Sequence, residues 1–155
     1  LMHLFEENIK NLGLNIPNPP KAVANYVPYK IVGKTMYISG QAPIQNGEVI
    51  YKGKVGSDIT NEDGIKAARL CVINIIAAVQ NGLEGNWDKL DSFVKLTGFV
   101  NCKDDFTDQP KIINGASDML VDIFGDQGRH TRVAVGSNAL PLGIAVEIDA
   151  IVQLK

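Results

Sequence analysis

The chain has 155 residues, of which 45% are hydrophobic and 21% charged, and its formal net charge is −2 at pH 7. This length favours one domain with a single buried core, and the small negative charge disfavours nucleic acid as a partner. No apolar run approaches the roughly 18 residues that a membrane span requires, so we expect no membrane partner. The 2 cysteines and 2 histidines are too few for a disulfide framework or a metal site of the usual spacing.

The first residues of the chain predict an extension rather than part of a sheet. Residues 1–13 carry apolar side chains at helical spacing and predict a short amphipathic helix that ends at Gly13. Residues 15–27 are rich in proline and asparagine, which is typical of an extended connector. Acidic residues stand where a secretory signal would carry positive charge, so we expect a cytoplasmic protein.

Short strands follow this connector. Residues 26–32 and 35–39 have β character and are separated by a turn at Gly33 and Lys34. Asn46-Gly47 is a strong signal for a two-residue hairpin.

Helices then alternate with strands along the rest of the chain. A helix is predicted from Thr60, which can cap its first turn, to Gly82. A second helix is predicted over residues 109–124, with Gly125 as its cap. Further strands are predicted at residues 92–100, 132–135 and 145–154.

This order indicates an α+β fold in which two helices cover one face of a single sheet. In the last strand Val146, Ile148, Ala150 and Val152 share one face, but Ile151 lies on the other among polar residues. Because both faces carry apolar side chains, we expect the face away from the helices to pack against another copy of the chain.

Arg132 and Glu147 are the candidate chemical groups of the last two strands. Arg132 begins one strand, and Glu147 lies on the next. If the two strands are neighbours, these charges approach each other at one end of the sheet. A guanidinium is a rigid fork of donors that suits a small carboxylate, and a nearby acid can orient or deprotonate water. Alternatively, the two residues form an ion pair that only closes the barrel or an interface.

Two sequence blocks resemble the RidA (YjgF-type) family, also called endoribonuclease L-PSP. The first block is Arg132, then Leu140-Pro141 eight and nine residues later, then VEIDA at residues 146–150. The second is Tyr26 followed, thirteen residues later, by SGQAP at residues 39–43. A weaker match is FVNCKDDF followed by Asn114 at the start of the second helix. The resemblance covers residues 22–154, so residues 1–20 are an extension of one domain, 1–155.

The resemblance implies a chorismate-mutase-like mixed sheet with two covering helices, assembled as a homotrimer around a central barrel. Binding pockets would lie in the clefts between subunits. The arginine-bearing branch of the family hydrolyses small enamines and imines, such as 2-aminoacrylate and 2-iminobutanoate, to 2-oxo acids and ammonia. No metal or organic cofactor is implied.

By the same resemblance, Arg132 would hold the substrate carboxylate and Glu147 would position the attacking water. Tyr26, Ser39 and Gly40 would line the pocket. Two further positions belong to this predicted site: Asn114 close by, and Ala134, whose backbone would contact the imine nitrogen. We also expect Arg132 close to Glu147 to keep that acid ionised and therefore a weak base.

The chain departs from the family pattern at two places. Ala134 stands where well-known members carry a cysteine, and about four residues are inserted around residues 107–111. A non-catalytic trimer that binds small carboxylates is therefore an alternative, because it needs Arg132 but not Glu147. An endoribonuclease or translation inhibitor is a weaker alternative, since the chain is acidic and has 3 arginines.

Overall fold

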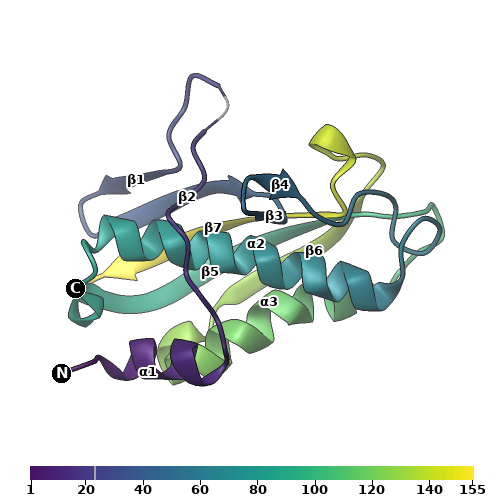
Figure 1. Ribbon diagram of the computed structural model, residues 1–155. Coiled ribbons are helices and arrows are strands. Elements are labelled where there is room, and N and C mark those ends of the chain that lie inside the picture. The colour runs from purple at the N-terminus through teal and green to yellow at the C-terminus, as the bar shows by residue number, and fades with distance from the viewer. Residues whose placement is uncertain (23) are drawn as a thin grey trace.

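A computed structural model describes residues 1–22 and 24–155. Its main sheet has five strands in the order β1-β2-β7-β5-β6, and β3 and β4 form a separate small hairpin (Figure 1). Only β5 and β6 pair in parallel within the described sheet. The strands are β1 (Tyr29–Val32), β2 (Thr35–Gln41), β3 (Ile44–Gln45), β4 (Glu48–Val49), β5 (Leu90–Asn101), β6 (Thr131–Ser137) and β7 (Val146–Leu154). The helices are α1 (Leu4–Asn11), α2 (Asn61–Gly82) and α3 (Gln109–Phe124), with short 3₁₀ turns η1 (Trp87–Lys89), η2 (Gly125–Gly128) and η3 (Pro141–Gly143).

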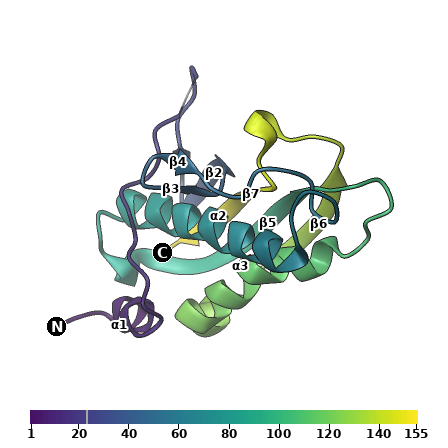
Figure 2. The same cartoon turned by 45° about the vertical axis from the view of Figure 1, so that its right-hand side comes forward.

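Helices α2 and α3 lie side by side on one face of the sheet, as predicted (Figures 1 and 2). The predicted cap of α2 is also present, because the Thr60 side chain accepts a hydrogen bond from the backbone N–H of Asp63 at 3.1 Å. Alternate residues of β7 are buried under the helices, among them Val146 and Ile148. The mixed α+β fold predicted from the sequence is confirmed.

The N-terminal helix α1 packs on the end of α3. Phe5 is buried, and its ring lies 4.9 Å from that of Phe124 in an edge-to-face arrangement. The Asn8 side-chain amide donates a hydrogen bond to the Ile123 carbonyl at 2.8 Å. After α1 the chain crosses over the outer side of α2 (Figure 1). The predicted connector at 15–27 includes Val23, which lies outside the described residues.

The prediction that Tyr26 lies in a strand is wrong. Strand β1 begins at Tyr29, and Tyr26 is in a bend with 52% of its surface exposed. Pro28 explains the late start of this strand, because proline lacks an N–H and restricts the residue before it. The Pro28 carbonyl still accepts a hydrogen bond from the backbone N–H of Ser39 at 2.9 Å.

The face of the sheet away from α2 and α3 keeps large apolar side chains exposed. Tyr37 of β2 is 50% exposed, and Val133 and Val135 of β6 are 43% and 39% exposed. This pattern agrees with the expectation that both faces are apolar, while the trimer stays a prediction. Among the described residues, no helix is both long and apolar enough to cross a membrane.

Candidate functional site

The Arg132 side chain lies on the helix-covered face and reaches across to α3. Its Nη1 donates to Asn114 Oδ1 at 2.8 Å and to Ser117 Oγ at 3.1 Å. Its Nη2 donates to the Pro110 carbonyl at a longer 3.4 Å. Asn114 and Ser117 are one helical turn apart, so α3 presents both to the same guanidinium.

These bonds leave part of the guanidinium available to a ligand. Arginine has five N–H donors in a planar fork. Two of them are used on Nη1, and one on Nη2. Within residues 1–22 and 24–155, the Nε hydrogen and the second Nη2 hydrogen have no acceptor. A guanidinium with such donors free can take a carboxylate in a bidentate contact.

Glu147 lies on the opposite face of the sheet, against a bulge in β2. The pairing of β2 with β7 shifts between Ile38 and Gln41, so the ladder is irregular at this point. The Glu147 carboxylate fills the space beside Gly40. A Cβ atom placed on Gly40 would lie 2.2 Å from Glu147 Oε2. Glycine is therefore the residue that lets the carboxylate approach this backbone.

Ser39 and the segment before β1 lie beside the same bulge. The Ser39 hydroxyl donates to the Val27 carbonyl at 2.7 Å. This bond holds the segment that follows Tyr26 against β2. The structure thus brings Ser39, Gly40 and Glu147 together, with Tyr26 one residue away from the Ser39 contact.

The prediction that Arg132 and Glu147 meet is wrong within one chain. Strand β5 lies between β6 and β7, so the two residues are on strands that do not touch. Arg132 is level with Leu96 of β5, and Glu147 is level with Phe99, three residues further along. With ordinary strand spacing, their Cα atoms are about 14 Å apart, and their side chains leave opposite faces.

The expected effect of Arg132 on Glu147 is also absent within the described chain. Burial raises the pKa of the Glu147 carboxyl above its usual range, and the negative charge of Asp149 raises that pKa further. The prediction that a nearby guanidinium holds Glu147 ionised as a weak base is therefore wrong for the single chain. Without that cation, the carboxylate is a stronger base than an ordinary glutamate.

The remaining predicted positions lie with Arg132. Asn114 bonds its guanidinium directly, and Ala134 is two residues further along β6, on the same side of that strand. Sequence reasoning missed Ser117 and His130, which lie next to Arg132 in space. The signal was present in part, because Ser117 is three residues after Asn114 on a predicted helix and His130 is two residues before Arg132.

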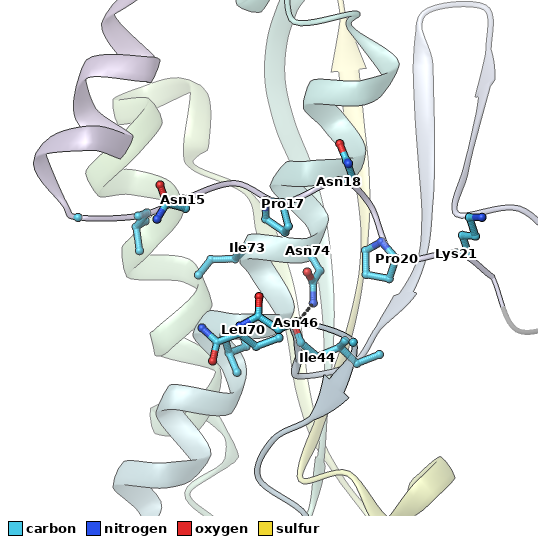
Figure 3. A pocket seen from close by; sticks show the side chains of 14 residues that line it. Asn15, Pro17, Asn18, Pro20, Lys21, Ile44, Asn46, Leu70, Ile73 and Asn74 are labelled. Carbon is cyan, nitrogen blue, oxygen red and sulfur yellow. Dashed lines mark hydrogen bonds between the residues drawn. The ribbon is translucent and has the colours of Figure 1, made fainter.

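A cavity of about 720 Å³ lies elsewhere, between the segment after α1, the outer face of α2 and the β3–β4 hairpin (Figure 3). Asn74 of α2 is one of the residues that line this cavity and is buried, and its amide donates to the carbonyls of Ala42 and Ile44 at 3.1 and 3.0 Å. This amide ties α2 to the hairpin. Neither Arg132 nor Glu147 lines this cavity, so it is separate from the candidate site.

Residues 6–153 match the family model described as "YjgF/chorismate_mutase-like, putative endoribonuclease". The chain belongs to the YjgF family. Protein TCP17 of Trypanosoma cruzi, a relative of this YjgF protein, is 39% identical over 96% of this chain and 92% of its own length.

Solved structures agree with this membership of the YjgF family. The protein Atu1372 of Agrobacterium tumefaciens, of unknown function, is 41% identical, with a TM-score of 0.92 over 98% of this chain and 93% of its own. A "putative endoribonuclease" of Shewanella oneidensis is 33% identical, with a TM-score of 0.93 over 98% of this chain and 100% of its own. TdcF of E. coli, solved with bound serine, is 26% identical, with a TM-score of 0.64 over 88% of this chain and 93% of its own.

Proposed function

We propose that this protein hydrolyses small imine and enamine carboxylates to 2-oxo acids and ammonia, without a cofactor. The observation that carries the proposal is the guanidinium of Arg132, which is held by α3 but keeps donors free for a carboxylate. The second part is Glu147, a partly buried carboxylate beside Gly40 that can accept a proton from water. The serine bound in the structure of TdcF carries the same kind of small carboxylate.

We further propose that Arg132 of one protomer and Glu147 of a neighbouring protomer form each site. In one chain the cation and the acid lie on opposite faces of the sheet, so neither completes the other. The exposed apolar face with Tyr37, Val133 and Val135 supplies a surface for such an assembly. A homotrimer with a central barrel, the assembly that the family resemblance implies, would bury this face.

The reaction requires the substrate and one water to be oriented more than it requires the water to be activated. The free donors of Arg132 hold the substrate carboxylate. Glu147 accepts a proton from water while the water oxygen bonds to the C=N carbon. Glu147 then returns the proton to the nitrogen of the carbinolamine. The C–N bond breaks, and the hydroxyl proton leaves with ammonia, which gives the 2-oxo acid and ammonium. A protonated imine is a strong electrophile, so fixing the carboxylate and one water is sufficient.

Ser39, Gly40 and Tyr26 belong to the Glu147 part of this proposed site. Gly40 gives the carboxylate its place, and Ser39 holds the chain segment next to Tyr26 through its bond to the Val27 carbonyl. Asn114 and Ala134 belong to the Arg132 part. Asn114 orients the guanidinium, and the Ala134 backbone would contact the imine nitrogen.

The direct test is the release of 2-oxo acid from 2-iminobutanoate generated in the assay by an amino-acid oxidase. We expect wild type to accelerate release, and Glu147→Ala and Arg132→Ala to lose that acceleration. If the wild-type protein binds 2-oxobutanoate in calorimetry but does not accelerate hydrolysis, the proposed enzymatic activity is refuted. The alternative function, a small-carboxylate-binding module, would then stand, since the Arg132 half-site is formed without Glu147.

A mixing experiment tests the shared site. Arg132→Ala and Glu147→Ala protomers are unfolded together, refolded and assayed. If each site takes one residue from each of two protomers, about a quarter of the sites in a random assembly regain both groups. Each variant refolded alone is the control. If the mixture stays as inactive as the two separate variants, the two residues do not act across an interface.

A further inference from the structure

A chain of hydrogen bonds runs from Arg132 into the turn between α3 and β6. Arg132 Nη1 donates to Ser117 Oγ at 3.1 Å, and Ser117 Oγ lies 2.8 Å from His130 Nε2. The other ring nitrogen, His130 Nδ1, lies 2.7 Å from the Gly128 carbonyl oxygen. These hydrogen bonds link Arg132 to Ser117, Ser117 to His130, and His130 to Gly128. Both Ser117 and His130 are at least partly buried.

Only one arrangement of hydrogen atoms satisfies this chain with a neutral histidine. The Gly128 carbonyl can only accept, so His130 Nδ1 carries the ring proton. His130 Nε2 is then an acceptor and takes the hydroxyl proton of Ser117. Ser117 Oγ has a lone pair left for the Arg132 hydrogen. Burial lowers the pKa of His130, and the positive charge of Arg132 lowers it further, which agrees with a neutral ring.

The geometry of the fold fixes each member. His130 directly precedes β6, and Gly128 ends η2, so a short connection sets the ring between them. Ser117 projects from α3 on the same side as Asn114. The guanidinium Nη1 therefore has two acceptors on one rigid helix, and one of these acceptors is itself oriented by the histidine.

We propose that Ser117 and His130 are positioning residues that hold the Arg132 guanidinium with its free donors directed at the substrate carboxylate. This inference rests on the proposed function, in which Arg132 binds that carboxylate. An arginine side chain has about 2 kcal/mol of rotamer entropy to lose on binding. Because Ser117 and Asn114 immobilise Nη1 beforehand, the ligand loses less freedom and binds more tightly.

The test measures the affinity for 2-oxobutanoate by calorimetry and the KM and kcat for 2-iminobutanoate. We expect Ser117→Ala to raise both Kd and KM about tenfold, the effect of one lost hydrogen bond to a charged group, with a smaller change in kcat. His130→Leu leaves the Ser117 hydroxyl without its acceptor, so we expect it to raise both constants by a smaller factor. Ser117→Thr keeps a hydroxyl, and His130→Gln keeps an acceptor, so both should restore most of the affinity. Ser137→Ala is the matched control, because its hydroxyl bonds the Ala139 carbonyl near the far end of the same strand, away from Arg132.

A double-mutant cycle separates positioning from a loss of folding. In an Arg132→Ala background, Ser117→Ala should change the Kd no further, since no guanidinium remains to be held. If Arg132→Ala weakens binding but Ser117→Ala and His130→Leu bind like wild type, the positioning role is refuted while the proposed function stands. If Arg132→Ala itself binds 2-oxobutanoate like wild type, Arg132 does not bind the carboxylate. Both the proposed function and this inference are then refuted.

Discussion

Gly40→Ala should inactivate the protein while leaving its fold almost unchanged. The added methyl group would lie 2.2 Å from Glu147 Oε2 and 3.1 Å from its Cδ. Ordinary contact begins at about 3.4 Å, so the carboxylate must retreat by about 1 Å. A misplacement of that size costs about a hundredfold in rate when a group must hold a water in line. Gly40 has no positive φ, so alanine adds no backbone strain there.

The cost in stability should be small, because the displaced atom is the end of a side chain that is not fully buried. We expect a change of less than about 1 kcal/mol in the free energy of unfolding. Denaturant titration measures this change, and 2-oxo acid release measures kcat/KM. Gly136→Ala is the control, since its methyl group would contact the side chains of Gln109 and Cys102 instead.

Gly40→Ala in a Glu147→Asp background tests whether the methyl group acts through the carboxylate. The shorter aspartate side chain leaves room for the methyl group, so Gly40→Ala should reduce kcat/KM less there than in wild type. An equal loss in both backgrounds would mean that Gly40 acts on the backbone or the pocket shape and not through Glu147.

Three further predictions concern the pH dependence, the guanidinium and the extension. Burial raises the pKa of Glu147 and the negative charge of Asp149 raises it further, so Asp149→Asn should move the acidic limb of the pH–rate profile for kcat/KM to lower pH, and an unmoved limb would argue against Glu147 as the base. Arg132→Lys keeps the charge but loses the planar fork, so the Kd for 2-oxobutanoate should rise about tenfold or more, and an unchanged Kd would argue against bidentate binding. Phe5→Ala should cost about 3 kcal/mol and change the fluorescence of Trp87, whose ring lies 6.2 Å from Phe5, while kcat stays within about twofold of wild type.

The spacing of apolar residues along the chain was sufficient to predict the helices and the strand that carry the site. Helical spacing predicted α2 and α3 with nearly the observed bounds, because each helix buries one stripe of apolar side chains. Alternation within β7 separated Glu147 from the buried Ile148, since successive side chains of a strand point to opposite faces. Motif spacing was also sufficient for the family, because Arg132, Leu140-Pro141 and Glu147 keep their order and distances along the chain.

Tertiary structure alone decided where Arg132 and Glu147 lie relative to each other. The order β7-β5-β6 comes from long-range pairing, which leaves no trace in the periodicity of any one strand. The faces were equally undetermined, because a shift of one residue in register moves every side chain of a strand to the other face. The hydrogen bonds of Ser117 to Arg132 and His130 could not be predicted from the sequence either. They form only because α3 packs beside β6 in the tertiary structure, which brings the Ser117 hydroxyl close to both residues.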